Sequence, residues 1–134
     1  MDAMPLEISQ ELSAWSSQLR NVKKTLLFLE KRLLEMPLGG TAVGTGINAH
    51  PRFAKTFAKE LSYLIGGKCK AVSSENFFHE LSSQDTAVQL SGELKNLAVV
   101  LMKISNDLRW MNSGPLAGLS EIELKALQPV SYTH

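Results

Sequence analysis

The stretch SSQDTAVQLSGELKNLAVVLMKISNDLRWMNSGP, residues 82–115, decides the fold class of this chain. Apolar residues recur along it at alternating intervals of three and four, which is the heptad spacing of a helix that packs lengthwise against other helices. The seam consists of Ala87, Leu90, Leu94, Leu97, Leu101, Ile104, Leu108 and Met111. We therefore predict one long helix that starts near Ser83 and ends before Gly114 and Pro115.

The middle of this helix, LAVVLM at 97–102, is apolar almost all the way round. A helix of that kind is normally enclosed by neighbours on every side. One long partner helix cannot enclose it. The sequence thus predicts more helices around residues 97–102 than the chain contains, which points to self-association into a multi-helix bundle.

A second seam of the same spacing lies nearer the start of the chain. Its members are Ile8, Leu12, Trp15, Leu19, Val22, Leu26, Leu29 and Leu33. Because proline suits the first turn of a helix, we predict a helix from about Pro5 to Met36, about 48 Å long at ~1.5 Å per residue. Pro37, Gly39 and Gly40 are expected to end it.

A third helix is predicted between the two seams. It opens at His50-Pro51, takes Asn48 as its cap and stops at Gly66-Gly67. Phe53, Phe57, Leu61 and Leu64 give it one apolar face.

Two shorter helical pieces are also expected. The segment SSENFFHEL at 73–81 predicts one or two turns capped by Ser73 or Ser74, and residues 120–128 predict a last short helix capped by Ser120. No segment shows the strict alternation of a half-buried strand, so the predicted fold class is all-α.

The composition is that of a single globular domain. The chain has 134 residues, a net charge of +1, 44% apolar residues and 20% charged residues, which argues against disorder and against a nucleic-acid or acidic-membrane partner. One cysteine, Cys69, rules out a disulfide framework and a cysteine-based zinc site. No apolar run approaches a membrane span of about 18–20 residues, and the first residues lack a secretory signal. We therefore expect a cytoplasmic protein.

The glycine-rich stretch GGTAVGTGIN at 39–48 is the first candidate for a binding site. It lacks the Gly-Lys-Ser/Thr ending of a Walker loop, and its Gly44 and Gly46 lack the third glycine and the preceding strand of a dinucleotide motif. Two interpretations stay open. Glycine lets backbone N–H groups approach an anion, and it also ends helices and forms turns.

Few titratable residues suggest catalysis. His50, His79 and His134 form no spaced metal-binding set with acidic residues, so no metal site is predicted. Asp85 falls in the first turn of the long helix at 83–113, where an acid stabilises the helix dipole. Asp107 is expected to form a local ion pair or a subunit contact.

Three stretches of the chain resemble class II fumarate hydratases, which belong to the fumarase/aspartase superfamily. They are GGTAVGTGINAHP at 39–51, SSQDTAVQLSGELKNLAV at 82–99 and LMKISNDLRWMNSGPLAGLSEI at 101–122. Three long matches in the same order are far more specific than a short motif. The resemblance extends from Asp2 to about Pro129.

The resemblance implies a fold and an activity. Residues 1–129 would form the central helical-bundle domain of a fumarase-like enzyme, whose family members are homotetramers with a large shared bundle. The implied reaction is the reversible hydration of fumarate to malate, a step of the tricarboxylic acid cycle, without a cofactor. In the family a base removes a proton next to a carboxylate, and aligned donors stabilise the dianionic intermediate in a site built from three subunits.

The chain departs from the family pattern at both ends. Met1 stands where the family has a Gly-Arg-Thr-His run, and VSYTH at 130–134 stands where the family has a mobile loop with a catalytic serine. Ser131 is the one residue that could be aligned with that serine, and its surroundings do not match. No catalytic residue is therefore assigned. We expect residues 130–134 to be a tail foreign to the family and the fragment alone to be inactive.

The resemblance also implies site residues. In the family the glycine-rich loop lies close to the active-site cleft, so Thr41, Thr45 and Asn48 are expected to line the substrate site. Two alternatives stay open: a fragment of an aspartase, which deaminates aspartate, and a helical oligomerisation module without activity.

Overall fold

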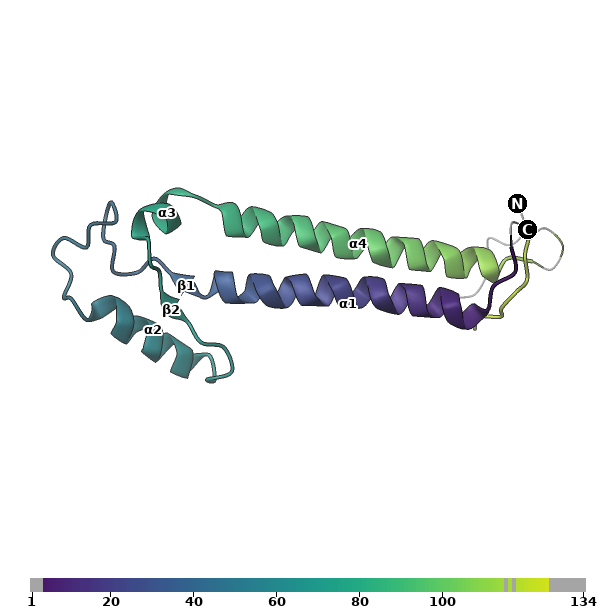
Figure 1. Ribbon diagram of the computed structural model, residues 1–134, viewed down its shortest axis with the longest axis horizontal. Helices are drawn as coiled ribbons and strands as arrows, with labels where there is room; N and C mark the ends of the chain where they lie inside the picture. Colours follow the sequence, from purple (N-terminus) through teal and green to yellow (C-terminus); the bar gives the residue numbers. More distant parts are fainter. Residues whose placement is uncertain (1–3, 115, 117, 126–134) are drawn as a thin grey trace.

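Two long helices, α1 (Ile8–Leu33) and α4 (Asp85–Met111), run side by side along the molecule (Figure 1). The computed structural model describes residues 4–114, 116 and 118–125. Beyond one end of the long pair lie the remaining elements, β1 (Glu35–Met36), α2 (Phe53–Leu64), β2 (Val72–Ser73) and α3 (Phe77–Ser82). The predicted all-α class, built on long helices, is confirmed.

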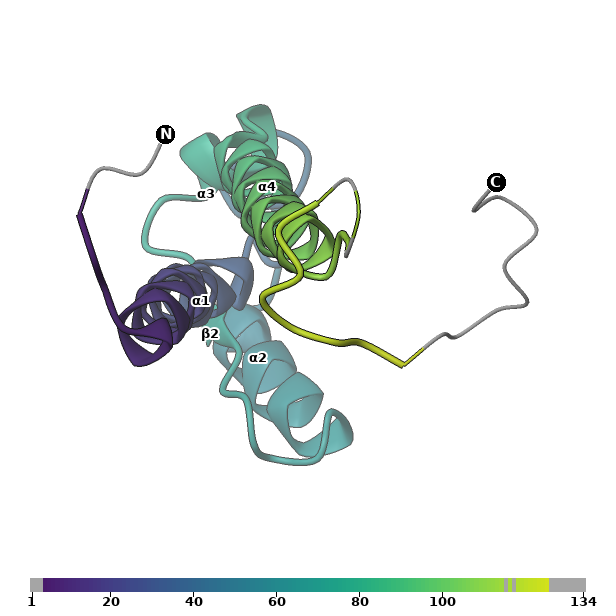
Figure 2. The same cartoon turned by 90° about the vertical axis from the view of Figure 1, so that its right-hand side faces the viewer.

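One row of α1 side chains forms the core of the long pair. Trp15, Val22 and Leu29 lie seven residues apart and are buried. The view along the helices also shows α1 and α4 next to each other (Figure 2). Because the three residues repeat at the heptad interval, they stay on the same side of the helix over its whole length.

Each predicted seam splits into two rows in the structure. On α4, Leu90, Leu97 and Ile104 are partly buried, whereas Leu94 and Leu101 are 51% and 48% exposed. No residue of α4 is fully buried. The second row of each seam is therefore largely exposed on the single chain, with Leu26 and Leu108 partly buried.

The helix α1 is shorter at both ends than predicted. It begins at Ile8, where the Gln10 side chain accepts a hydrogen bond of 2.8 Å from the Glu7 amide. It ends at Leu33, before the turn at 37–40 that was expected to stop it. The reason is that the chain straightens into β1, and the residue before a proline avoids helical geometry.

A short parallel strand pair holds this junction. The amide of Val72 donates to the carbonyl of Leu34 at 2.9 Å, and the amide of Ser74 donates to that of Met36 at 3.0 Å. Two residues are too few to show alternation in a sequence, so β1 and β2 could not be predicted from the pattern. The pair brings the two ends of the segment 37–71 together.

The end of α2 follows the prediction. The amide of Gly66 donates to the Tyr63 carbonyl at 3.1 Å, and that of Gly67 donates to the Ser62 carbonyl at 2.9 Å. Both glycines have positive φ, which gives the Schellman geometry of a glycine-terminated helix.

The predicted start of α2 is wrong. The helix begins at Phe53, after Arg52, and no side chain caps its first turn. Asn48 lies in the preceding loop with a φ of 66° and does not cap the helix. The turn at His50 and Pro51 separates Asn48 from the first helical residue.

The predicted caps of α3 are also wrong. Asn76 caps this helix by accepting a hydrogen bond of 3.1 Å from the His79 amide. Ser74, one of the two serines predicted for that role, instead accepts from the Asn76 amide at 3.1 Å. The cap therefore lies two or three residues later than expected.

The segment after α4 is not the predicted helix over the residues that the structure describes. Residues 121–125 form neither helix nor strand, and the amides of Glu121 and Leu124 donate to the Met111 carbonyl and to the Asn112 side chain, at 2.8 and 2.7 Å. These amides thus form hydrogen bonds with the end of α4 and not with the carbonyls of a following helix. Residues 126–134, including the predicted tail at 130–134, lie outside the described residues. In the described part of the chain, no helix is both long and apolar enough to cross a membrane.

Leu29→Ala is expected to destabilise the chain by about 2–5 kcal/mol, because it leaves a cavity between α1 and α4 where the side chain is 3% exposed. Urea unfolding of the purified chain measures the change. Lys24→Ala, on the exposed face of the same helix, is the control and should change stability by no more than about 0.5 kcal/mol. Equal losses in the two variants would contradict the placement of Leu29 in the core.

Candidate functional site

The glycine-rich loop, residues 39–48, folds around one carbonyl. The Gly40 carbonyl accepts hydrogen bonds from the amides of Gly44 and Gly46, both at 3.0 Å, and from the Thr41 hydroxyl at 2.7 Å. Gly44 and Gly46 have φ values of 102° and 70°, which side chains rarely allow. Gly44 and Gly46 thus have a structural role, because they allow the turns of the loop.

The loop is also wedged between α2 and α3. A Cβ on Gly39 would lie 2.6 Å from a side chain of α2, and a Cβ on Gly40 would lie 2.8 Å from the Cβ of Phe77 in α3. A Cβ on Gly44 would lie 2.9 Å from the Phe78 ring. Real Cβ atoms do not approach so closely, so these glycines are needed for packing.

The three residues predicted to line the substrate site all lie exposed in this loop. Thr41 and Asn48 have φ values of 56° and 66°, in the left-handed region that few residues other than glycine adopt. The Thr41 hydroxyl donates its proton to the Gly40 carbonyl, which leaves its oxygen as an acceptor. Non-glycine residues held at positive φ are concentrated at ligand sites. This observation supports the prediction that Thr41 and Asn48 line a binding site.

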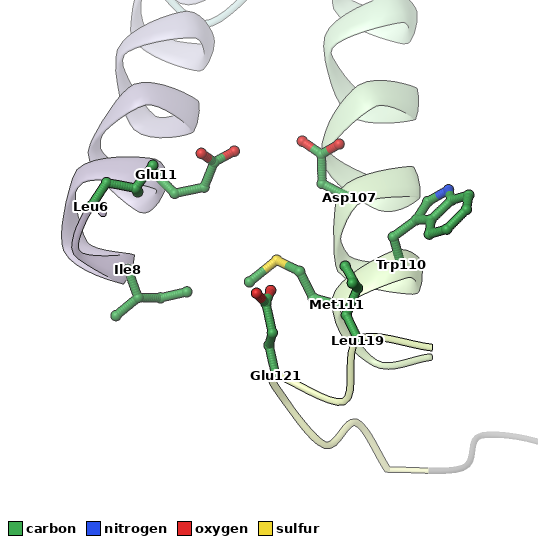
Figure 3. Close-up of a pocket in the computed structure, with 8 residues that line it drawn as sticks. All are labelled: Leu6, Ile8, Glu11, Asp107, Trp110, Met111, Leu119 and Glu121. Atoms are coloured by element: carbon green, nitrogen blue, oxygen red, sulfur yellow. The ribbon is translucent and has the colours of Figure 1, made fainter. Parts of the chain in front are cut away.

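A separate hollow of ≈ 630 Å³ opens at the other end of the long pair, between the start of α1 and the end of α4 (Figure 3). Apolar and acidic side chains line it, namely Leu6, Ile8, Glu11, Asp107, Trp110, Met111, Leu119 and Glu121. Glu11 and Asp107 point toward each other across the gap (Figure 3).

Lys103 joins these two carboxylates. Its ammonium lies 3.2 Å from Glu11, pairs with Asp107 one turn away, and lies 5.7 Å from the centre of the Trp15 ring. The hydrogen bond to Asp107 is the main cause that raises the pKa of Lys103, so the lysine stays charged at neutral pH. The local ion pair predicted for Asp107 is confirmed, and it links α4 to α1 through Glu11.

The charge of this hollow is unsuitable for an anionic ligand. Glu11, Asp107 and Glu121 bring three carboxylates, and Lys103 balances one of them. A dicarboxylate would meet like charge here. The glycine-rich loop contains no charged residue and offers hydroxyl, amide and backbone donors, so it is the better candidate for an anion.

A third cluster joins α3 to α4. His79 Nε2 lies 3.0 Å from Asp85 Oδ2, and His79 Nδ1 lies 3.1 Å from Glu80 Oε1. The predicted place of Asp85 in the first turn of its helix is confirmed. In the sequence, His79 is adjacent to Glu80. The pairing with Asp85, six residues on, follows no helical spacing and depends on the break between the two helices.

No cysteine nucleophile or metal site emerges from the described residues. Cys69 Sγ donates to Glu30 Oε1 at 3.0 Å, and this hydrogen bond is the main cause that raises the pKa of the thiol. A raised pKa keeps the thiol protonated and unreactive at neutral pH. Within residues 4–114, 116 and 118–125, no group of three histidine, cysteine or acidic side chains is placed to hold a metal ion.

A protein-family model described as lyase matches residues 1–132. The chain belongs to this lyase family. The class II fumarate hydratase 2 of Pseudomonas aeruginosa is 56% identical to the lyase chain over 131 residues, which are 98% of this chain and 28% of that protein. A class II fumarate hydratase of Xylella fastidiosa is also 56% identical over 131 residues, 98% of this chain and 27% of the relative.

Solved lyase structures have the same arrangement of elements. The recombinant class II fumarase of Schistosoma mansoni matches with a TM-score of 0.93 and 33% identity, over 100% of this chain and 31% of that one. The fumarate lyase:delta crystallin of Brucella melitensis matches with a TM-score of 0.88 and 39% identity, over 98% and 28% of the two chains. The lyase chain thus spans little more than a quarter of the curated relatives it matches.

Proposed function

We propose that this chain serves in a class II fumarate hydratase, which reversibly adds water to fumarate to give malate. The identity of 56% to relatives named for that activity, over 98% of the chain, is the observation that carries the proposal. An aspartase is the second candidate from the sequence, and the names of these relatives favour the hydratase. The reaction belongs to the tricarboxylic acid cycle, and we propose a cytoplasmic location for the enzyme.

We propose that the glycine-rich loop contributes Thr41, Thr45 and Asn48 to the substrate site. The loop is uncharged, its three polar side chains are exposed, and two of them are held at positive φ. The Thr45 hydroxyl and the Asn48 amide are the donors that can stabilise a developing dianion, whereas Thr41 would first have to turn its hydroxyl away from the Gly40 carbonyl. The proton transfer itself needs an acid and a base for which the described residues offer no candidate, so we propose that other parts of a complete enzyme supply them.

We propose that the exposed rows of α1 and α4 assemble into a homotetramer. Within the described residues, only five apolar side chains are buried, and α4 contributes none of them. Burying a Leu, Val or Met side chain is worth about 1.5–3 kcal/mol, so the exposed rows provide a large driving force for association. The fumarate and malate site would then form where copies of the chain meet.

A chimaeric enzyme tests the hydratase proposal. Residues 2–125 replace the matching segment of the Pseudomonas aeruginosa relative, and both fumarate hydration and aspartate deamination are assayed. We expect hydration only. We expect the 134-residue chain alone to show no turnover, because its described residues offer no candidate acid and base for the proton transfer.

Single substitutions in the same chimaera test the loop. Removing one preorganised donor typically lowers kcat by about 10²–10³, so Asn48→Ala and Thr45→Val should lower it by at least about tenfold. Thr25→Ala is the control, since the Thr25 hydroxyl donates to the Asn21 carbonyl within α1. Unchanged kinetics in the loop variants would remove the loop from the site. A folded chimaera that deaminates aspartate would contradict the hydratase proposal and favour an aspartase.

A further inference from the structure

His79 sits where the chain breaks between α3 and α4, and each of its ring nitrogens faces a different carboxylate. Nε2 lies 3.0 Å from Asp85 Oδ2, and Nδ1 lies 3.1 Å from Glu80 Oε1. Ionised carboxylates only accept hydrogen bonds, and a neutral imidazole carries a single N–H. The neutral ring can therefore satisfy one of these carboxylates, whereas the imidazolium donates to both.

The helix that carries His79 needs outside support. α3 has six residues, too few to be stable by its own backbone hydrogen bonds. It presents Phe77 and Phe78 to the glycine-rich loop, where Gly40 and Gly44 leave no room for a Cβ. A contact that fixes α3 against α4 therefore also fixes the surface on which the loop rests.

We propose that His79 is a proton-operated clasp between α3 and α4. When the imidazole is protonated, it joins Glu80 of α3 to Asp85 of α4 and holds α3 under the glycine-rich loop. When it loses its proton, the two carboxylates compete for the single remaining N–H, so the Asp85 contact, the one of the two that crosses from α3 to α4, is weakened and α3 opens more often. The clasp is a property of the chain itself, and it requires neither the substrate nor the activity proposed above.

The charges around the imidazole favour its protonated form. They are the carboxylates of Glu80 on α3, Asp85 on α4, Glu35 on β1 and Glu75 just before α3. Arg32 on α1 is a cation, and it acts on Asp85, whose pKa it lowers. The hydrogen bond to Asp85 is the main cause that raises the pKa of His79. The same hydrogen bond is the main cause that lowers the pKa of Asp85.

These directions set the pH window of the clasp. The contribution of His79 to stability is fully present below its ordinary pKa of about 6.5 and is lost as the pH rises through the raised pKa of the folded state. The contribution of Asp85 is present above its ordinary pKa of about 3.9 and is lost as the pH falls through the lowered value. The clasp is thus closed below the ordinary pKa of His79 and opens as the pH rises through its raised pKa.

Two measurements on the full chain test the clasp. Proton NMR follows the titration of the His79 ring, identified by the signal that disappears in His79→Gln. Hydrogen exchange with mass spectrometry follows the amides of α3 across the same pH range, after correction for the intrinsic exchange rate. We expect a titration midpoint above the ordinary value and, above that midpoint, at least about threefold more frequent opening of α3.

Two variants distinguish the clasp from a general effect of pH. In Asp85→Asn, the His79 midpoint should fall toward its ordinary value, and the pH dependence of α3 exchange should disappear. His50→Gln should change neither, because His50 Nδ1 accepts from the Arg52 amide in the loop before α2. A His79 midpoint at or below the ordinary value would overturn the proposal. So would α3 exchange that is unchanged when His79 titrates.

Discussion

Leu101→Asp is expected to dissociate the proposed homotetramer while leaving the α1–α4 pair folded. Leu101 lies in the middle of α4 on the row that α1 does not cover, and it is 48% exposed in the single chain. An aspartate there can keep its water in the monomer. In an assembly the same carboxylate would be buried without a partner, at a cost of about 3 kcal/mol or more per subunit. Light scattering should show a fall in mass, with helical circular dichroism retained.

The control for this experiment adds the same charge elsewhere on the same helix. Asn106→Asp is nearly isosteric, and Asn106 is an exposed polar residue. It should keep the mass of the parent chain. A Leu101→Asp variant that retains the full mass would place this row outside the interface. A parent chain that is monomeric at high micromolar concentration would rule out self-association.

Gly44→Ala is expected to cost about 2–5 kcal/mol, because two penalties add at this position. Its φ of 102° is unfavourable for alanine, by about 1–2 kcal/mol for residues in left-handed geometry. Its Cβ would also lie 2.9 Å from the Phe78 ring and 3.0 Å from the Phe78 amide nitrogen, and overpacking costs about 1–3 kcal/mol. Thermal unfolding measures the sum.

Two other glycines separate the penalties. Gly67 has a φ of 69°, and an added methyl group there would meet nothing within 4 Å, so Gly67→Ala carries the backbone penalty alone, about 1–2 kcal/mol. Gly40 lies outside the left-handed region, and its Cβ would lie 2.8 Å from Phe77, so Gly40→Ala carries the packing penalty alone. If Gly44→Ala lowers stability by no more than Gly67→Ala does, α3 can shift to accommodate the added methyl group. The loop would then not be tightly packed against α3.

The long helices could be predicted from the sequence because heptad spacing is a strong, repeated signal. The division of each seam could not. Leu97 and Leu101 are both seam residues, yet only Leu97 is partly buried in the chain. Spacing identifies an apolar stripe without identifying which helix covers which part of it. The same limit applies to Leu29, which is buried, and Leu33, which is exposed.

Local signals predict some boundaries and miss others. Gly66-Gly67 ends α2 as expected, because the glycine pair provides its own hydrogen-bond geometry. The sequence favours Asn48 as a cap, whereas the structure places it at positive φ in a loop. Asn is common both as a helix cap and as a loop residue at positive φ. The packing of the loop on α3 decides between these roles, and it cannot be read from the sequence.

The candidate site was predictable only in part. The glycine-rich loop could be located from the sequence. Its packing against Phe77 and Phe78, however, depends on a contact between segments more than 30 residues apart. The interaction of His79 with Asp85 likewise depends on the angle between two helices. Each of these features requires tertiary structure, whereas residue spacing describes neighbours along one element.

The short strand pair suggests an order of folding events, in which β1 and β2 pair before α1 and α4 pack along their length. The hydrogen bond between Arg32 and Gln89 joins residues 57 positions apart, and the one between Glu11 and Lys103 joins residues 92 apart. Closing such loops from an open chain slows folding, although the entropy cost grows only slowly with length. Pairing of β1 with β2 closes a shorter loop first and brings the near ends of α1 and α4 together. Each later contact along the helices then closes only a few additional residues, so the hairpin can fold progressively from the strands toward the chain termini.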